Sequence, residues 1–144
     1  MLRTIAGAAL CATFALSAAN AQQAVEVKGQ KAKILLNQPI SGTTLSDLNG
    51  KYQLRAAETT FEPGGFIGAH HHAGPGIRCI QSGELTFVTD GKTTIYKPGE
   101  CFYEPGNVSH TARNATDKPV VINNFEILPM SVTGGSAMPV PATR

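Results

Sequence analysis

Two short segments of the chain hold histidines at the spacing of a metal site. His70 and His72 stand two residues apart, and side chains two apart in a β-strand point to the same face, so both imidazoles can reach one ion while His71 points away. His110 is the only other histidine in the sequence. Neutral imidazole is the commonest metal-donating side chain in proteins. The sequence therefore predicts a metal site at His70, His72 and His110; the alternative is that the run of three histidines is merely an exposed polar segment.

The residues around these histidines resemble the two sequence motifs of the cupin family. The first motif is matched at Gly64 or Gly65, His70, His72 and Gly83. The second motif is matched at Gly99, Pro105, His110 and Asn114. Cupins are small double-sheet jelly rolls whose motifs bracket a metal at the mouth of the barrel. The resemblance covers residues 54–128 and implies an all-β protein, a double-stranded β-helix (cupin jelly-roll barrel).

Two residues depart from the cupin pattern, and the first of them bears on the chemistry. Most cupins carry a glutamate ligand at the position where this chain has Gly76, and Asn107 stands where glycine is usual. A site of three neutral ligands resembles the three-histidine subset of cupins that includes some thiol and diketone dioxygenases, or a site that has lost tight metal binding. The expected cofactor is one divalent transition metal ion, and the sequence does not choose among Fe, Zn, Ni, Mn and Cu.

The metal would decide the reaction. With Fe(II), the resemblance implies dioxygenation of a small chelating molecule. With zinc, nickel or manganese, an open three-ligand metal would polarise a substrate for isomerase, lyase or hydrolytic chemistry. The sequence thus predicts a metal-dependent small-molecule enzyme. Because fold alone does not fix function, a non-catalytic small-ligand-binding or sensor module is the alternative, and a structural barrel with a degenerate site is a third reading.

The resemblance also places the strands that carry Cys79 and Cys101 side by side in one sheet. In an oxidising compartment such a pair can form a disulfide, and two buried free thiols are the alternative. Side chains alternate between the two faces of a strand. If the first two site histidines point inward and this alternation continues unchanged across the turn at residues 74–76, Arg78 points inward and Cys79 points outward. A disulfide would then put Glu104 on the inner side as well.

Glu104 and Arg78 are accordingly the two candidate functional residues besides the histidines. Glu104 would act as a substitute metal ligand, as an acceptor for a histidine N–H, or as a catalytic general base; the alternative is a carboxylate at the rim. Arg78 would pair with Glu104 or bind the carboxylate of an acidic substrate, because an unpaired buried charge is costly; the alternative is that the turn leaves it outside. Tyr96 and Tyr103 are weaker acid–base candidates.

The rest of the chain is predicted to build the barrel. Strands bounded by Gly, Pro or Asp-Gly are expected at Tyr52–Phe61, Phe66–His72, Ile77–Gln81, Leu85–Thr89, Thr93–Tyr96, Cys101–Glu104, Ser109–Asn114 and Val120–Leu128. Residues 22–53 are expected to be a leader with an edge strand at Lys33–Leu36. Residues 129–144, rich in Gly, Pro, Ser and Thr, are expected to be a flexible tail.

Residues 1–21 have the features of a secretory signal peptide. Arg3 supplies a positive start, residues 5–16 an apolar stretch, and Ala19-Asn20-Ala21 a cleavage site. We expect cleavage after Ala21 and a periplasmic or secreted protein that is not attached to a membrane afterwards. A short anchoring helix is disfavoured because the apolar stretch is shorter than the roughly 18 residues that a membrane span needs.

Length and composition indicate one small domain. The chain has 144 residues, of which 42% are hydrophobic and 15% charged. A formal net charge of +2 without a basic run argues against a nucleic-acid partner. The expected partners are a small-molecule ligand, acidic if Arg78 binds it, and, from the resemblance, a second copy of the chain that pairs through an outer sheet face.

Overall fold

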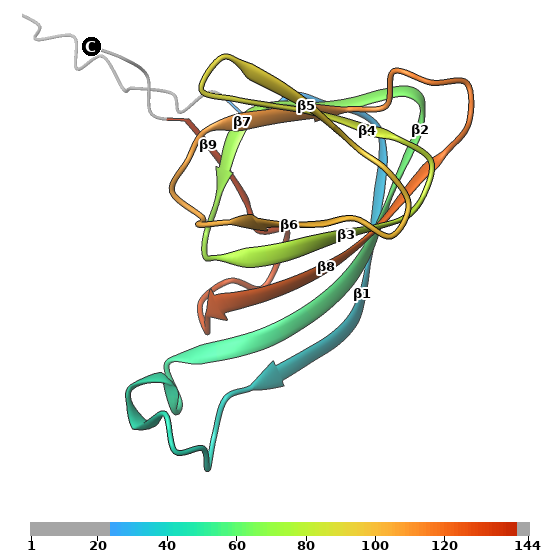
Figure 1. Ribbon diagram of the computed structural model, residues 1–144. Coiled ribbons are helices and arrows are strands. Elements are labelled where there is room, and N and C mark those ends of the chain that lie inside the picture. The colour runs from blue at the N-terminus through green and yellow to red at the C-terminus, as the bar shows by residue number, and fades with distance from the viewer. Residues whose placement is uncertain (1–23, 141–144) are drawn as a thin grey trace, which may run out of the picture.

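The computed structural model describes residues 24–140, and within them the chain forms a nearly closed β-barrel with one short helical turn, η1 (Ser46–Leu48) (Figure 1). The strands are β1 (Val27–Pro39), β2 (Tyr52–His72), β3 (Gly76–Ser82), β4 (Leu85–Thr89), β5 (Lys92–Tyr96), β6 (Cys101–Glu104), β7 (His110–Arg113), β8 (Val120–Pro129) and β9 (Ala137–Pro139). The predicted all-β jelly-roll architecture is confirmed. The predicted signal peptide lies outside the described residues. No helix in the described range is long and apolar enough to span a membrane.

β2 holds the two layers of the barrel together because it runs through both. Its first part, residues 52–61, pairs with β8, and its second part pairs with β7 between residues 66 and 70. The hydrogen-bonded order is β5-β4-β7-β2-β8-β3-β6, and β1 and β9 also pair with β2. The sequence predicts two strands here, whereas the structure has one bent strand. Gly64 has a φ of +72°, and a Cβ on Gly65 would lie 2.6 Å from the Gly29 carbonyl oxygen, so the bend depends on both glycines.

The segment predicted as a leader is part of the barrel wall. β1 is 13 residues long, far more than the expected edge strand Lys33–Leu36, and it pairs with β2 from Val27 to Pro39. Two register shifts, one around Gly29 and one around Leu35, interrupt its pairing. Each shift reverses the faces of the alternating side chains, so the period-two pattern that would have revealed the strand is broken in the sequence.

The end of the chain also differs from the prediction of a flexible tail, as far as the structure describes it. Ala137–Pro139 forms β9, which pairs antiparallel with His70–His72 at the end of β2. The amide of Ala73 donates to the Ser136 carbonyl oxygen at 2.9 Å. Composition gave no sign of this order, because the segment is held by backbone pairing, by side chains of β2 and by a single small apolar residue, Ala137, packed against the core.

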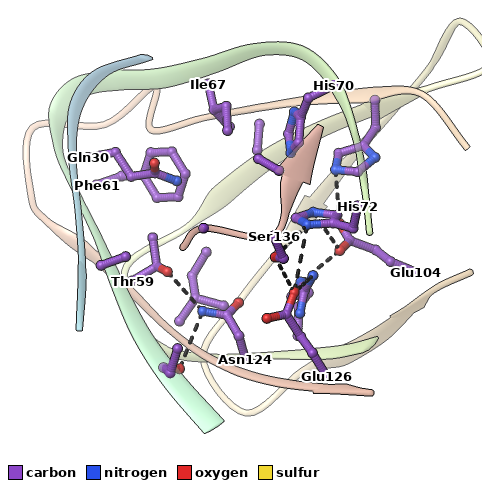
Figure 2. Close-up of a pocket in the computed structure, with 18 of the residues that line it drawn as sticks. Gln30, Thr59, Phe61, Ile67, His70, His72, Glu104, Asn124, Glu126 and Ser136 are labelled. Atoms are coloured by element: carbon purple, nitrogen blue, oxygen red, sulfur yellow. Dashed lines mark hydrogen bonds and ion pairs between the residues drawn. The ribbon is translucent and has the colours of Figure 1, made fainter. Parts of the chain in front are cut away.

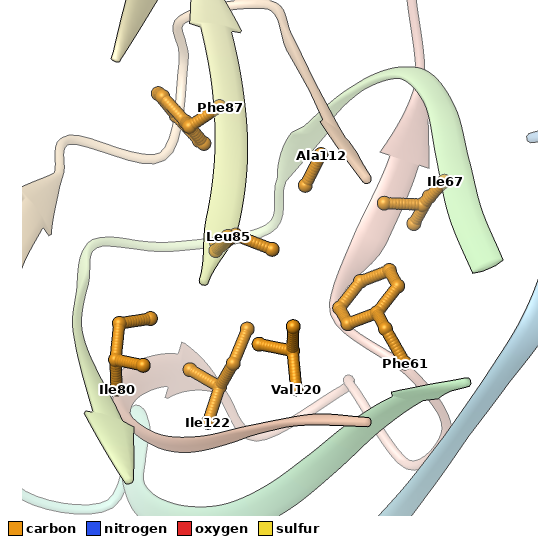
Figure 3. Close-up of a cluster of buried hydrophobic side chains, with 8 residues drawn as sticks. All are labelled: Phe61, Ile67, Ile80, Leu85, Phe87, Ala112, Val120 and Ile122. Atoms are coloured by element: carbon orange, nitrogen blue, oxygen red, sulfur yellow. The ribbon is translucent and has the colours of Figure 1, made fainter. Parts of the chain in front are cut away.

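A compact apolar cluster fills the space between the two layers (Figure 3). Its members come from β2, β3, β4, β7 and β8, and are Phe61, Ile67, Ile80, Leu85, Phe87, Ala112, Val120 and Ile122. Full burial of each large aliphatic or aromatic side chain stabilises the fold by about 1.5–3 kcal/mol. Several of the same residues line one side of a cavity, so the core also fixes the shape of the site.

Cys79 and Cys101 form a disulfide between β3 and β6. The two residues lie directly opposite each other in the pairing of these strands. Because faces alternate along a strand, an outward disulfide fixes Arg78 and Glu104 on the inner face of their strands, where both are buried. The bridge therefore holds in register the two strands that carry the charged residues of the site.

Candidate metal centre

His70, His72 and His110 come together in one cluster. Figure 2 labels His70 and His72 beside Glu104 in the cavity. Their candidate ligand atoms all lie within 4.8 Å of one another. His70 and His72 share a face of β2, and His110 on β7 is the direct cross-strand partner of His70. His70 and His110 are buried, and His72 is half-buried. The structure thus brings together the three histidines that the sequence singles out, in an arrangement compatible with metal binding.

Hydrogen bonds fix which ring nitrogen of each histidine faces the centre. His70 Nδ1 lies 2.8 Å from the Gly68 carbonyl oxygen, and His110 Nδ1 lies 3.0 Å from the Val108 carbonyl oxygen. A carbonyl oxygen can only accept, so both Nδ1 atoms carry a proton, and Nε2 is the ring nitrogen left to bind an ion. His72 Nδ1 lies 3.0 Å from the Ser136 hydroxyl. These partners orient the rings as metal-ligating histidines are commonly oriented.

Glu104 faces two of these nitrogens. Its Oε2 lies 3.2 Å from His72 Nε2, and its Oε1 lies 3.2 Å from His110 Nε2. Two unprotonated acceptors do not attract each other, so each of these contacts needs a proton on one partner or a cation between the atoms. The donor set, neutral imidazoles with one carboxylate, suits a divalent transition metal.

The position of Glu104 explains how the chain can lack the usual carboxylate at Gly76. Gly76 and Glu104 are direct partners in the pairing of β3 with β6. A Cβ on Gly76 would lie 2.7 Å from Arg78 Nη1 and 2.9 Å from the Phe125 carbonyl oxygen, so no side chain fits there. The carboxylate reaches the histidines from the neighbouring strand instead.

Arg78 lies inside the barrel between two carboxylates. Its Nε donates to Glu104 Oε2 at 2.7 Å, and its Nη2 donates to Glu126 Oε1 at 2.9 Å. All three side chains are buried. Arg78 Nη1 is buried without a hydrogen-bond partner in the described part of the chain. The guanidinium is therefore neutralised by protein carboxylates and holds Glu104 in place, a different situation from a free cation awaiting an acidic substrate.

Sequence reasoning missed Glu126 and Ser136, which contact each other and both lie beside His72. The Ser136 hydroxyl donates to Glu126 Oε1, and His72 Nδ1 lies 3.7 Å from the same oxygen. The alternation of β8 could have revealed Glu126, because Val120 and Ile122 are buried core residues and Glu126 has the same parity. Nothing in the sequence pattern pointed to Ser136.

The tyrosines lie away from the histidines. Tyr103 is 66% exposed, as expected for a residue on the outward face of β6. Tyr96 stacks on Phe102, with ring centroids 4.0 Å apart. Burial, followed by the charge of Glu100, raises the pKa of Tyr96 above its ordinary value, which makes it a weaker acid. Glu104 and Glu126 are therefore the acidic groups closest to the centre.

The histidines open onto a cavity of about 330 Å³. Two cationic and two anionic side chains line it, Arg55, Arg78, Glu104 and Glu126. At the other end of the cavity the polar side chains are Gln30, Thr59 and Asn124 (Figure 2). Asn124 Nδ2 donates to Thr59 Oγ1 at 2.8 Å and to the Ala57 carbonyl oxygen at 3.3 Å, so its Oδ1 remains free to accept from a ligand. The volume and lining suit a small polar molecule.

Burial keeps His70 and His72 neutral. Burial, then the electrostatic interaction with His110, lowers the pKa of His70 to about 4 from its usual 6.5. Burial, then the Arg78 charge, lowers the pKa of His72 to about 2. Both imidazoles are therefore unprotonated near pH 7, the state that a metal requires.

We expect metal-free protein to lose stability as the pH falls from 6.5 to 4. The unfolded chain takes up a proton on His70 near pH 6.5, whereas the folded chain resists it until about pH 4, so acid favours the unfolded state across this window. The contribution of His70 is roughly 3 kcal/mol over the whole window. Urea unfolding of chelator-treated protein at several pH values measures it. His70→Asn should make the profile shallower, because the contribution of His72 then remains, and His71→Asn should leave it unchanged; equal profiles for all three proteins would contradict this assignment.

A jelly-roll barrel with histidines from two strands at one end defines the class of protein. The sequence profile of a family described as "Cupin domain" matches residues 57–128, and the chain belongs to the cupin family. No curated protein matches the chain.

Solved structures show the same fold. A cupin-like protein from Thermotoga maritima has a TM-score of 0.57 at 24% identity, with 79% of this chain and 78% of that one covered. The polyketide cyclase RemF from Streptomyces resistomycificus has a TM-score of 0.58 at 14% identity, covering 81% and 75%. KdgF from Halomonas sp. has a TM-score of 0.53 at 21% identity, covering 70% and 84%.

Proposed function

We propose that this cupin is an exported metalloprotein that acts on a small anionic molecule. His70, His72 and His110 would hold one divalent transition metal ion, with Glu104 as the fourth ligand. The observation that carries the proposal is the pair of 3.2 Å approaches between Glu104 and the Nε2 atoms of His72 and His110. A cation among these atoms turns an unfavourable contact between acceptors into a ligand set.

The charge around the cavity favours an anionic ligand. The two arginines and two glutamates that line it balance each other, so a divalent ion would leave the site positive. Bound there, the metal would supply polarisation of a chelated oxygen group for isomerase-like or lyase-like chemistry or, if it is iron, oxygen activation of the dioxygenase type. The chain's own residues would orient the ligand: Asn124 through its free Oδ1, and the apolar wall by excluding water.

A non-catalytic small-ligand-binding or sensor protein is the second candidate, and one observation favours it. Both oxygens of Glu104 face histidines, and Oε2 also accepts from Arg78. A carboxylate engaged in this way is poorly placed to take a proton from a substrate, which weighs against the general-base role that the sequence suggests for Glu104. Such a protein would bind and release its ligand unchanged.

The test uses mature protein purified without a tag from the periplasm of an expressing bacterium. Elemental analysis should find about one equivalent of a transition metal. Small carboxylic and hydroxycarboxylic acids are then screened for binding by calorimetry, and for product and dioxygen consumption by mass spectrometry and an oxygen electrode. Product formation supports the enzyme, and saturable binding without product supports the sensor. Folded protein that takes up no metal would refute the metalloprotein proposal.

Export is part of the proposal. The signal-like residues 1–21 and the disulfide between Cys79 and Cys101 support it together, because disulfides persist in oxidising compartments outside the cytoplasm. Mass spectrometry of the secreted or periplasmic protein should find an N-terminus at residue 22, and full-length protein retained in the cytoplasm would contradict export.

We also propose that two copies pair through the outer face of one layer. A row of neighbouring apolar side chains crosses five strands there: Leu36, Ala56, Phe125, Ile77 and Tyr103. Four of them are about half exposed or more, which is unusual for a monomer. Phe125→Lys together with Tyr103→Lys should convert a dimer into a metal-competent monomer in analytical ultracentrifugation. A wild-type monomer, or a variant that stays dimeric, would contradict the pairing face.

A further inference from the structure

We propose that the C-terminal strap, residues 132–139, is part of the metal centre and that its Ser136 is a positioning residue for His72. This inference rests on the proposed metal site, because it concerns how one of the three histidines is held. The strap lies outside the part of the chain that the Cupin domain profile matches. Metal affinity would therefore depend on a segment that the family motifs do not contain.

Two side chains of β2 anchor the strap to the barrel. Arg55 Nη1 donates to the Gly134 carbonyl oxygen at 2.6 Å, and its Nη2 donates to the Val132 carbonyl oxygen at 2.8 Å. Gln53 Nε2 donates to the same Val132 oxygen at 2.8 Å. Arg55 is only 4% exposed, and no carboxylate lies within ion-pair distance of it in residues 24–140. A buried guanidinium needs these carbonyl acceptors, so the barrel specifies where the strap lies.

Backbone pairing then sets the strap in register with the ligand-bearing end of β2. β9 pairs with His70–His72, and the Ala73 amide donates to the Ser136 carbonyl oxygen at 2.9 Å. Ser136 therefore stands next to His72 through main-chain hydrogen bonds, independently of any contact of its hydroxyl group.

The Ser136 hydroxyl joins His72 to the charged residues beneath it (Figure 2). It donates its proton to Glu126 Oε1, which Arg78 also holds. Because that proton is used, the oxygen must accept from His72 Nδ1–H, 3.0 Å away. This fixes the tautomer in which Nε2 carries the lone pair, and it fixes the rotation of the ring. The backbone carbonyls of Gly68 and Val108 do the same for the other two histidines, so the strap supplies the acceptor that the barrel lacks at His72.

The experiment measures Zn²⁺ affinity of the mature protein by competition with a chromophoric chelator, and the visible absorption of its Co²⁺ form. Loss of an outer partner of a ligating histidine typically weakens metal binding about 10–100-fold, and we expect this for Ser136→Ala. The Co²⁺ spectrum should change as well. Ser136→Thr keeps the hydroxyl and should bind within about threefold of wild type. Ser131→Ala, in the exposed residue just before the strap, is the matched control and should have no effect.

A second variant tests the effect of the position of the strap on metal binding, apart from the effect of the Ser136 hydroxyl group. Arg55→Met removes the anchor without touching the metal centre, and it should weaken Zn²⁺ binding in the same direction. The double variant with Ser136→Ala should be no weaker than Ser136→Ala alone, because both changes act through one contact. If Ser136→Ala binds Zn²⁺ as tightly as wild type with an unchanged Co²⁺ spectrum, the strap has no part in the centre. If wild type itself binds neither metal, the proposed metal function fails and this inference fails with it.

Discussion

Replacing His110 with alanine should leave the protein without bound metal, whereas replacing His71 should leave its metal content almost unchanged. His110 contributes one of three Nε2 lone pairs to a cluster that spans no more than 4.8 Å. The His71 ring instead lies beside main-chain oxygens, with its Nδ1 3.3 Å from the Gly106 carbonyl oxygen. Elemental analysis after dialysis should find about one equivalent in wild type and His71→Ala, and less than about a tenth in His110→Ala and His72→Ala.

Circular dichroism of each variant controls for folding, since two of the three site histidines are buried. His70→Ala completes the set of four alanine variants. If all four lost metal equally, the conclusion that His71 points away from the site while its neighbours point into it would be contradicted. Full retention in His110→Ala would place the ion elsewhere. Glu104→Gln provides a finer comparison, because it keeps the shape of the side chain and removes its charge; it should weaken metal binding without abolishing it.

The positions of the inward-facing residues could be predicted from the sequence because strand alternation is a local property. The step of two between His70 and His72 places both on one face, and the same rule predicts that Arg78 faces inward. The prediction that Glu104 faces inward depended on a disulfide between Cys79 and Cys101. Such a bridge places both cysteines on the same face of the sheet and so determines which face every other residue of the two strands occupies. The structure has that disulfide and buries Glu104.

The features that the sequence could not show depend on contacts between residues that are far apart in the chain. β1 contains two register shifts, and each breaks the alternation that marks a strand. Ser136 reaches His72 across 64 positions of the sequence, through a segment whose composition resembles a disordered tail. The alternation rule could have placed Glu126 on the inner face, but the sequence analysis predicts it only as part of the strand Val120–Leu128. Such contacts follow from how the barrel closes, which periodicity in one segment does not specify.

Gly76 illustrates how a carboxylate can lie beside the histidines although the motif position has no side chain. A cupin-type ligand at this position would need a Cβ where Arg78 Nη1 and a main-chain oxygen leave no room. Glu104, directly opposite on β6, brings a carboxylate to the histidines, and Arg78 holds it there. The motif position and the carboxylate lie on neighbouring strands, so the sequence motif alone does not include this carboxylate.

Replacing Arg78 with methionine should destabilise the metal-free protein by about 3–5 kcal/mol, the usual result of removing one partner from a buried ion pair. Glu104 and Glu126 are about 5% and 6% exposed and would lose the cation that both contact. Urea unfolding of chelator-treated wild type and variant at neutral pH measures this loss.

Arg113→Met is the matched control for this substitution, because Arg113 is an exposed arginine at the end of β7. Its loss should change the free energy of unfolding by less than about 0.5 kcal/mol. Combining Arg78→Met with Glu126→Gln should recover part of the lost stability, since only Glu104 then remains unpaired. Saturating metal should recover a further part by supplying positive charge beside Glu104. If Arg78→Met were as stable as Arg113→Met, the arginine would not be compensating these carboxylates in the folded protein, and its role would instead be to bind a ligand through its unpaired Nη1.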